Sequence, residues 1–145
     1  MSHCSWHNYG YGICTDDLEI SDVEKIKALI QLAPEYEKKV MQLFTDQGIT
    51  NLTVDDYLDL DIDYSCGIAT IIANVIHEVE GIWFTACSDY NCAVYLIYQP
   101  SYPWEMKETE HNLTEEAIRL ILVKYTSIIS DTILTIDYCS VENGG

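Results

Sequence analysis

The chain has 145 residues, 48% of them hydrophobic, and its 24 acidic and seven basic residues give a formal net charge of -17. The hydrophobic content excludes a wholly disordered acidic tail, and the length suits one domain with its own core. The charge excludes direct binding of nucleic acid or anionic lipid, which both need lysine and arginine to replace counterions. We therefore expect a single domain over 1–145.

The opening segment His3–Ile13 is aromatic and predicts a first strand. Gly10 and Gly12 have no side chains to pack within this strand, which indicates a bulge or the close approach of a neighbouring backbone. Asp16 and Asp17 then end the strand.

Two helices are predicted next. Ser21 and Glu24 have the spacing of a capping box, so the first helix should begin there and run to about Ala33. Pro34 suits the first turn of a second helix, and Gly48 should end it.

Two more helices precede the next strands. Thr53 should cap a short helix that contains Val54, Tyr57 and Leu58. A longer, mostly apolar helix is predicted from about Cys66 to Val79, with Gly81 as its C-terminal stop.

Ile82–Cys87 and Cys92–Tyr98 carry the clearest strand patterns, and Ser88–Asn91 between them predicts a hairpin turn. Asn112 should cap a helix over Leu113–Ile129, and a last strand should cover Thr132–Val141. The order is β-α(n)-β-β-α-β, which predicts an α+β domain with an antiparallel sheet of about four strands. This is a ferredoxin-like arrangement with extra helices in the first crossover.

The first residues, Met1–Gly12, lack the basic and apolar regions of a signal peptide, so we expect a cytoplasmic protein. The longest apolar stretches, Ile68–Ile76 and Ile118–Val123, are too short to span a membrane. In the cytoplasm the cysteines should stay reduced. They are Cys4, Cys14, Cys66, Cys87, Cys92 and Cys139.

The acidic residues form runs, and the densest holds five aspartates between Asp55 and Asp63. Asp59, Asp61 and Asp63 have the spacing of a calcium loop, but Tyr64 stands where that loop needs glycine, so we expect no calcium site. Few internal cations are available, which favours a basic partner surface, although the acidity could serve solubility alone. The predicted partner-binding residues are Asp16, Asp17, Asp55, Asp56, Tyr57, Asp59, Asp61, Asp63 and Tyr64.

Two alternatives stay open. His3 and His7 share a strand face and would need a third ligand to bind zinc, so the first strand offers a weak metal site, ligand site or active site. The apolar hairpin could instead mediate self-assembly into a homo-oligomer. The chain has none of the common nucleophile, phosphate-loop or metalloprotease motifs, so we expect a binding protein without cofactor or metal rather than an enzyme.

The segment Trp6–Asp17, WHNYGYGICTDD, is similar to the starts of small proteins carried by bacterial mobile elements. In size, charge and general sequence character the chain resembles phage-encoded anti-CRISPR inhibitors and the acidic immunity proteins that bind basic nuclease toxins. The resemblance implies an inhibitor that occupies the basic, nucleic-acid-binding surface of a partner protein, such as a nuclease.

Overall fold

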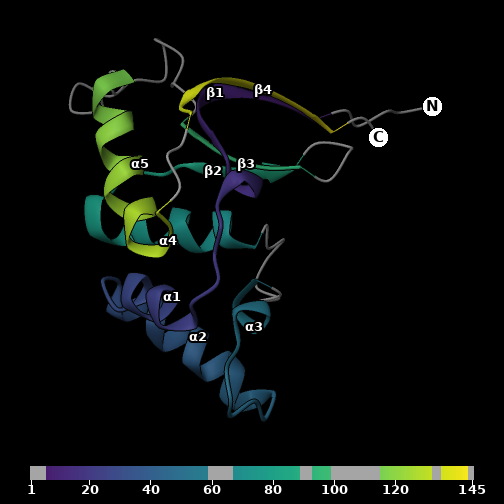
Figure 1. The fold of residues 1–145 in the computed structure, drawn as a ribbon, viewed down its shortest axis with the longest axis vertical. Coiled ribbons are helices and arrows are strands. Elements are labelled where there is room, and N and C mark those ends of the chain that lie inside the picture. Colours follow the sequence, from purple (N-terminus) through teal and green to yellow (C-terminus); the bar gives the residue numbers. More distant parts are fainter. Residues whose placement is uncertain (1–5, 59–66, 89–92, 99–114, 132–134, 144–145) are drawn as a thin grey trace.

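The computed structural model describes residues 6–58, 67–88, 93–98, 115–131 and 135–143 (Figure 1). The elements follow in the order β1 (Trp6–Cys14), the 3-10 turn η1 (Thr15–Asp17), α1 (Val23–Ile30), α2 (Pro34–Asp46), α3 (Val54–Leu58), α4 (Ile68–Glu80), β2 (Thr85–Ser88), β3 (Val94–Tyr98), α5 (Glu115–Ile129) and β4 (Asp137–Asn143).

The four strands form one antiparallel sheet in the order β2-β3-β1-β4. β1 and β2 run parallel to each other with the antiparallel β3 between them. β3 and β4 likewise run parallel with β1 between them. This confirms the predicted α+β class and the ferredoxin-like order. The predicted hairpin is also confirmed, because β2 and β3 pair with Thr85 opposite Ile97.

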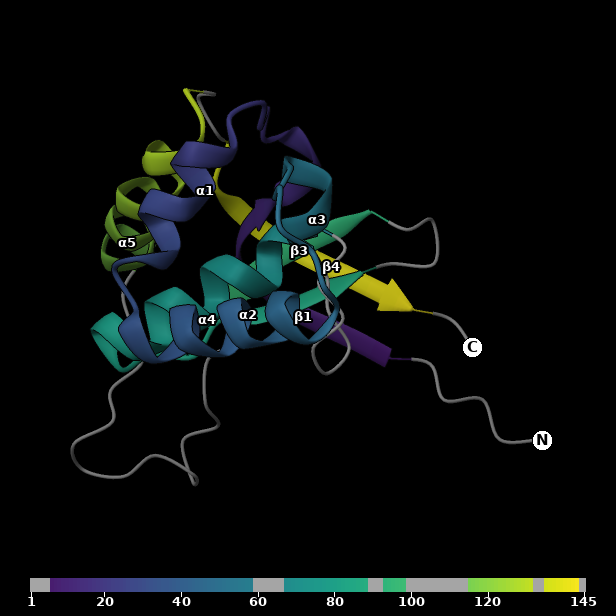
Figure 2. The ribbon, with the colours of Figure 1, turned by 90° about the horizontal axis from the view of Figure 1, so that it is seen from below.

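The molecule is built in three layers (Figure 1, Figure 2). α4 contacts β2 and β3, and α5 contacts β1, so these two helices cover one face of the sheet. α1 packs against α4 and α5, and α2 against α4, which places α1 and α2 outside that layer.

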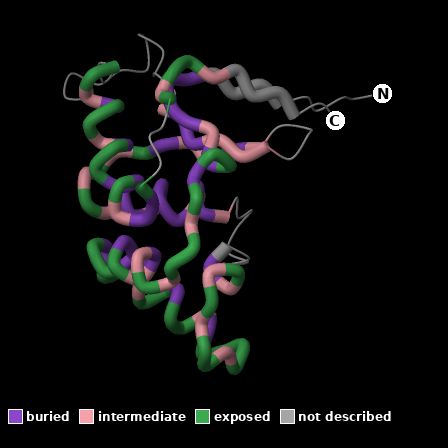
Figure 3. The backbone as a smooth tube through the Cα atoms, viewed as in Figure 1, coloured by how far each residue is buried: buried purple, intermediate pink, exposed green. Residues whose placement is uncertain are grey.

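The buried residues gather between these layers (Figure 3). Ile13 and Leu96 of the sheet, Ile72 of α4 and Leu122 of α5 are each at most 1% exposed and belong to one core cluster. The first crossover adds its own fully buried side chains to that cluster, namely Ile26, Leu29, Val40 and Tyr57. The helices α1–α3 are thus part of the same domain core.

Gly12 confirms the expected close approach of backbones. A Cβ atom at this position would lie 2.1 Å from the carbonyl oxygen of Leu96 and 2.7 Å from the Cα of Ile97. Only glycine lets β1 and β3 pair at this distance.

Several local signals for helix ends are confirmed. Pro34 stands in the first turn of α2. Gly48 follows that helix with φ at 70°. Its N–H donates to the carbonyl of Thr45, and the N–H of Ile49 donates to the carbonyl of Phe44. These two bonds form a Schellman motif. Gly81 ends α4 in the left-handed conformation.

The predicted start of α1 is wrong by one residue. Asp22, not Ser21, is the N-cap, and its carboxylate accepts the N–H of Glu24 at 3.0 Å. A charged aspartate next to the helix N-terminus also interacts favourably with the helix dipole, which a serine does not.

Two strands differ from the predicted ranges. β2 begins at Thr85 rather than Ile82, since its pairing with β3 begins where Thr85 faces Ile97; Trp83, before the strand, stacks on His77 of α4 with ring centroids 3.6 Å apart. β4 begins at Asp137 rather than Thr132, since its pairing with β1 begins where Asp137 faces Gly12. The predicted cap Asn112 lies outside the described residues.

Candidate functional site

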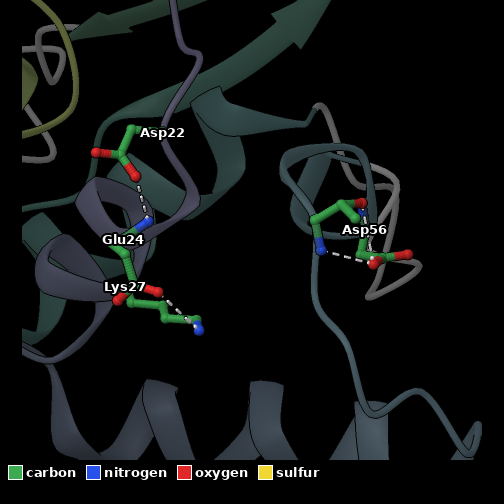
Figure 4. Close-up of polar contacts among 5 residues, drawn as sticks. Asp22, Glu24, Lys27 and Asp56 are labelled. Carbon is green, nitrogen blue, oxygen red and sulfur yellow. Dashed lines mark hydrogen bonds and ion pairs between the residues drawn. The ribbon is translucent and has the colours of Figure 1, made fainter.

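The fold brings carboxylates from separate acidic runs to one side of the crossover helices. We call this the acidic face and define it as Asp22, Glu24, Glu37, Asp55 and Asp56. α1 contacts both α2 and α3, and a surface pocket is shared by the start of α1 and the start of α3. Figure 4 shows Asp22 and Glu24 on α1 and Asp56 across from them on α3. Sequence spacing alone did not place Glu37 in this set.

Two of these carboxylates already serve the fold. Asp56 accepts the N–H of Thr53 at 2.8 Å, and the Thr53 hydroxyl accepts the N–H of Asp56 at 3.3 Å. This reciprocal pair is a capping box with aspartate in the third position. Asp22 caps α1 in a similar way. Asp22 and Asp56 therefore offer a partner only part of their hydrogen-bonding capacity.

The other carboxylates of the acidic face are less constrained. Asp55 is exposed, and the described residues place no cation in ion-pair contact with it. Glu24 is paired with Lys27 at 3.3 Å, an exposed contact of the kind that stabilises a helix only weakly. Asp55 and Glu24 are thus exposed carboxylates that can change partner at little cost, while Glu37 of α2 is half-buried.

Tyr57 is not the exposed anchor that the sequence suggested. Its side chain is 0% exposed and packs edge-on against Phe44, with ring centroids 5.1 Å apart. Its hydroxyl is buried and has no hydrogen-bond partner among the described residues. Burial raises the pKa of this hydroxyl, and the carboxylates of Glu24, Glu37 and Asp56 raise it further.

Tyr57 also lines a cavity of about 250 Å³ on the acidic face. This open surface cavity is lined by residues of α1, α2, α3 and the segment before α3. Its walls are Lys27, Ile30, Gln31, Glu37, Met41, Leu52 and Tyr57.

The remaining predicted partner-binding residues have different positions. Asp16 and Asp17 form η1 next to β3, where both are exposed and Asp16 accepts the N–H of Val94 at 3.4 Å. They belong to a different part of the surface from the cavity. Asp59, Asp61, Asp63 and Tyr64 lie outside the described residues, so their contact with a partner stays a prediction.

Two acidic residues with structural roles were missed from the sequence. Glu78 of α4 accepts the N–H groups of Glu35 and Tyr36, and Glu80 accepts the hydroxyl of Tyr125 and the ammonium of Lys124. Counting lysines and arginines overstated the unmatched charge, because backbone N–H and tyrosine O–H groups also satisfy carboxylates.

The other candidate chemistry finds little support in the described residues. No three His, Cys, Asp or Glu side chains within that part of the chain are arranged to hold a metal ion. His3 and the side chain of His7 lie outside it. Cys14, Cys87 and Cys139 carry thiols, and burial raises the pKa of the Cys139 thiol, which disfavours the reactive thiolate. No described helix has the length and apolar character needed to cross a bilayer.

No protein-family model, curated protein sequence or solved structure matches this chain. The acidic face and its cavity must therefore be interpreted from their own chemistry.

Proposed function

We propose that this protein is an acidic binding protein that occupies a basic surface of another protein, in the manner of an inhibitor or immunity protein. The convergence of carboxylates from α1, α2 and α3 on the acidic face carries the proposal. Simple solubility is served by charge dispersed over the surface, whereas recognition of a basic patch needs charge concentrated in one place.

The structure of the acidic face supports this use in a second way. Several of its carboxylates stand on helices whose positions are fixed by buried side chains, such as Ile26 on α1 and Tyr57 on α3. Charges held on packed helices lose little conformational entropy on binding, which improves affinity for a preformed basic surface. Asp16 and Asp17 of η1, apart from the acidic face, and the run from Asp59 to Asp63 stay predicted partner contacts on the basis of their charge.

A basic surface that binds nucleic acid is the partner that this proposal favours. Such surfaces carry lysine and arginine at regular spacing for phosphates, and clustered carboxylates can replace those phosphates. A cytoplasmic nuclease or other nucleic-acid-binding effector fits that description.

Affinity capture with the full chain tests the proposal. A variant with Glu24→Gln, Glu37→Gln and Asp55→Asn removes three charges while leaving the caps Asp22 and Asp56 in place. The control variant, Asp46→Asn, Glu116→Gln and Asp131→Asn, removes three exposed charges outside the acidic face, at the last residue of α2, in α5 and just after α5. A genuine partner should be captured by wild type and by the control, and lost by the acidic-face variant. Equal capture by both variants would contradict a specific role for the acidic face.

A further inference from the structure

A group of exposed apolar side chains surrounds one ion pair between α4 and α5, where α5 passes the end of α4 (Figure 1). The carboxylate of Glu80, the last residue of α4, accepts the ammonium of Lys124 on α5 at 3.0 Å. Two of the apolar side chains lie within three residues of Glu80, and two lie within four residues of Lys124. We call this group the neutral patch, and its members are Val79, Trp83, Leu120 and Val123. Four of the seven exposed large hydrophobic side chains among the described residues thus gather around one ion pair.

Trp83 is the largest side chain of the neutral patch, and its position is fixed. Its ring stacks on the ring of His77, with centroids 3.6 Å apart and an angle of 14° between the two planes. Because His77 lies about one helical turn before Glu80, the stack holds the indole against the end of α4. The indole is nevertheless 60% exposed. A tryptophan that is already held in place loses little side-chain entropy on binding, and tryptophan is a common anchor at protein interfaces.

Leu120 and Val123 form an apolar ridge on the outer side of α5. They are three residues apart in the helix, so they are neighbours on its surface, and they are 62% and 48% exposed. The inner side of α5 is supplied by other residues, such as the fully buried Leu122. The core therefore does not need this ridge, and clustered apolar surface of this kind is typical of a contact with another protein.

The charge of the neutral patch differs from that of the whole chain. The protein has 24 acidic and seven basic residues, whereas α5 has two residues of each sign. Inside the patch, Glu80 and Lys124 neutralise each other. Two copies of a chain with a formal charge of -17 repel each other, so they approach most easily where the local charge is balanced. A basic partner gains nothing from balanced charge, which makes a second copy the occupant that this surface fits.

We propose that two copies of this chain form a homodimer through the neutral patch. The same patch on both molecules makes an isologous interface, with Trp83 of each copy packed against Leu120 and Val123 of the other. The acidic face lies on α1, α2 and α3 and stays outside this interface, so the dimer does not depend on the proposed function. Four side chains cover less area than a permanent dimer needs, and the association should be weak and reversible.

Sedimentation equilibrium of the purified full chain tests the dimer. The average mass should rise from that of one chain toward that of two as the concentration increases from about 10 µM to about 1 mM. Sodium chloride at about 0.5 M should strengthen the association, because salt screens the repulsion between the two copies. Salt has the opposite effect on binding between the acidic face and a basic partner. A single-chain mass at about 1 mM protein and high salt would overturn the inference.

One pair of matched variants locates the interface. Leu120→Gln should weaken dimerisation at least about tenfold, because an isologous interface loses the side chain twice. Leu120 is exposed and glutamine is a good helix former, so thermal unfolding should stay close to that of wild type. The control is Met41→Gln, which replaces an exposed apolar side chain of α2 outside the patch and should leave dimerisation unchanged. Equal dimerisation of the two variants would show that the neutral patch is not the interface.

The dimer and the proposed function can fail separately. The acidic-face variant keeps all four residues of the neutral patch, so it should dimerise at least as strongly as wild type while it loses the captured partner. Leu120→Gln should behave in the reverse way and keep the partner. If the chain is monomeric and Leu120→Gln loses the partner, the neutral patch binds that partner and the dimer inference is wrong.

Discussion

Glu78 of α4 caps α2 by accepting the N–H of Tyr36, a residue 42 positions before it in the sequence. Its carboxylate oxygens accept the N–H of Tyr36 at 2.9 Å and the N–H of Glu35 at 3.1 Å. Ala33, the N-cap residue of α2, has no side-chain group to do this. The acidic residue thereby fixes the outer helix α2 to α4, and negative charge beside a helix N-terminus is favourable.

We predict that Glu78→Ala lowers the free energy of unfolding by about 1–2 kcal/mol, the usual effect of losing a helix cap. Urea denaturation at neutral pH measures this. The matched control is Glu116→Ala, an exposed glutamate of α5, which should change stability by less than about 0.5 kcal/mol. Equal effects of the two substitutions would show that the tertiary cap does not stabilise the protein.

A second tertiary contact of α4, made by the half-buried Glu80, predicts a pH dependence. Hydrogen bonds from Tyr125 at 2.6 Å and Lys124 at 3.0 Å hold the pKa of Glu80 below its ordinary value of 4.5. The folded protein therefore binds this proton more weakly than the unfolded chain does. The stabilisation is present above the ordinary value and is lost as the pH falls through the lowered one.

Glu80→Gln should accordingly cost about 1 kcal/mol of stability near neutral pH and progressively less as the pH falls below about 4. Urea denaturation of wild type and variant over this pH range gives the difference directly. A penalty that stays constant across the range would mean that ionised Glu80 has no special role.

Gly12 predicts the largest effect of a single methyl group. Gly12→Ala would place a carbon 2.1 Å from the Leu96 carbonyl oxygen, a backbone atom that cannot move without separating β1 from β3. We expect Gly12→Ala to lower the free energy of unfolding by about 3 kcal/mol or to prevent folding. Gly81→Ala should lower it by about 1 kcal/mol, because φ is 74° at this position but no atom lies within 4 Å of the added carbon. Thermal unfolding of the two variants tests the order, and a milder effect at Gly12 would contradict it.

Local signals predicted most of this fold, and the residues show why. Pro34, Gly48 and Gly81 mark helix ends through their own backbone preferences, and Thr53 does so through a local side-chain cap, so none of these signals depends on the rest of the chain. The strand pattern likewise predicted the hairpin.

The candidate site was less accessible from the sequence, because it depends on packing between distant segments. The caps made by Glu78 and the contact of Glu80 with Tyr125 join helices that sequence spacing cannot relate. A helix as short as Val54–Leu58 has too few turns to show which side is buried, so Tyr57 was assigned to the surface. Glu37 lies near the other carboxylates because α2 packs against α1, a contact that sequence spacing does not show.

The cysteines give a chemical prediction for the whole chain. We expect six reduced thiols in protein purified from a reducing cytoplasm. Alkylation in denaturant followed by intact-mass measurement should therefore count six adducts. A reproducible deficit of two would reveal a disulfide and contradict the expected compartment.

The most direct test of the central claim is the affinity of the purified partner for three forms of the protein, measured by calorimetry at low salt. These are wild type, the acidic-face variant (Glu24→Gln, Glu37→Gln, Asp55→Asn) and its control (Asp46→Asn, Glu116→Gln, Asp131→Asn). If the acidic face binds the partner, the variant should lose about 1–3 kcal/mol of binding free energy for each fully desolvated charge pair. Added salt should weaken partner binding by wild type more than partner binding by the variant. The control should remain close to wild type. Equal affinities of wild type and the acidic-face variant at low salt would contradict the account.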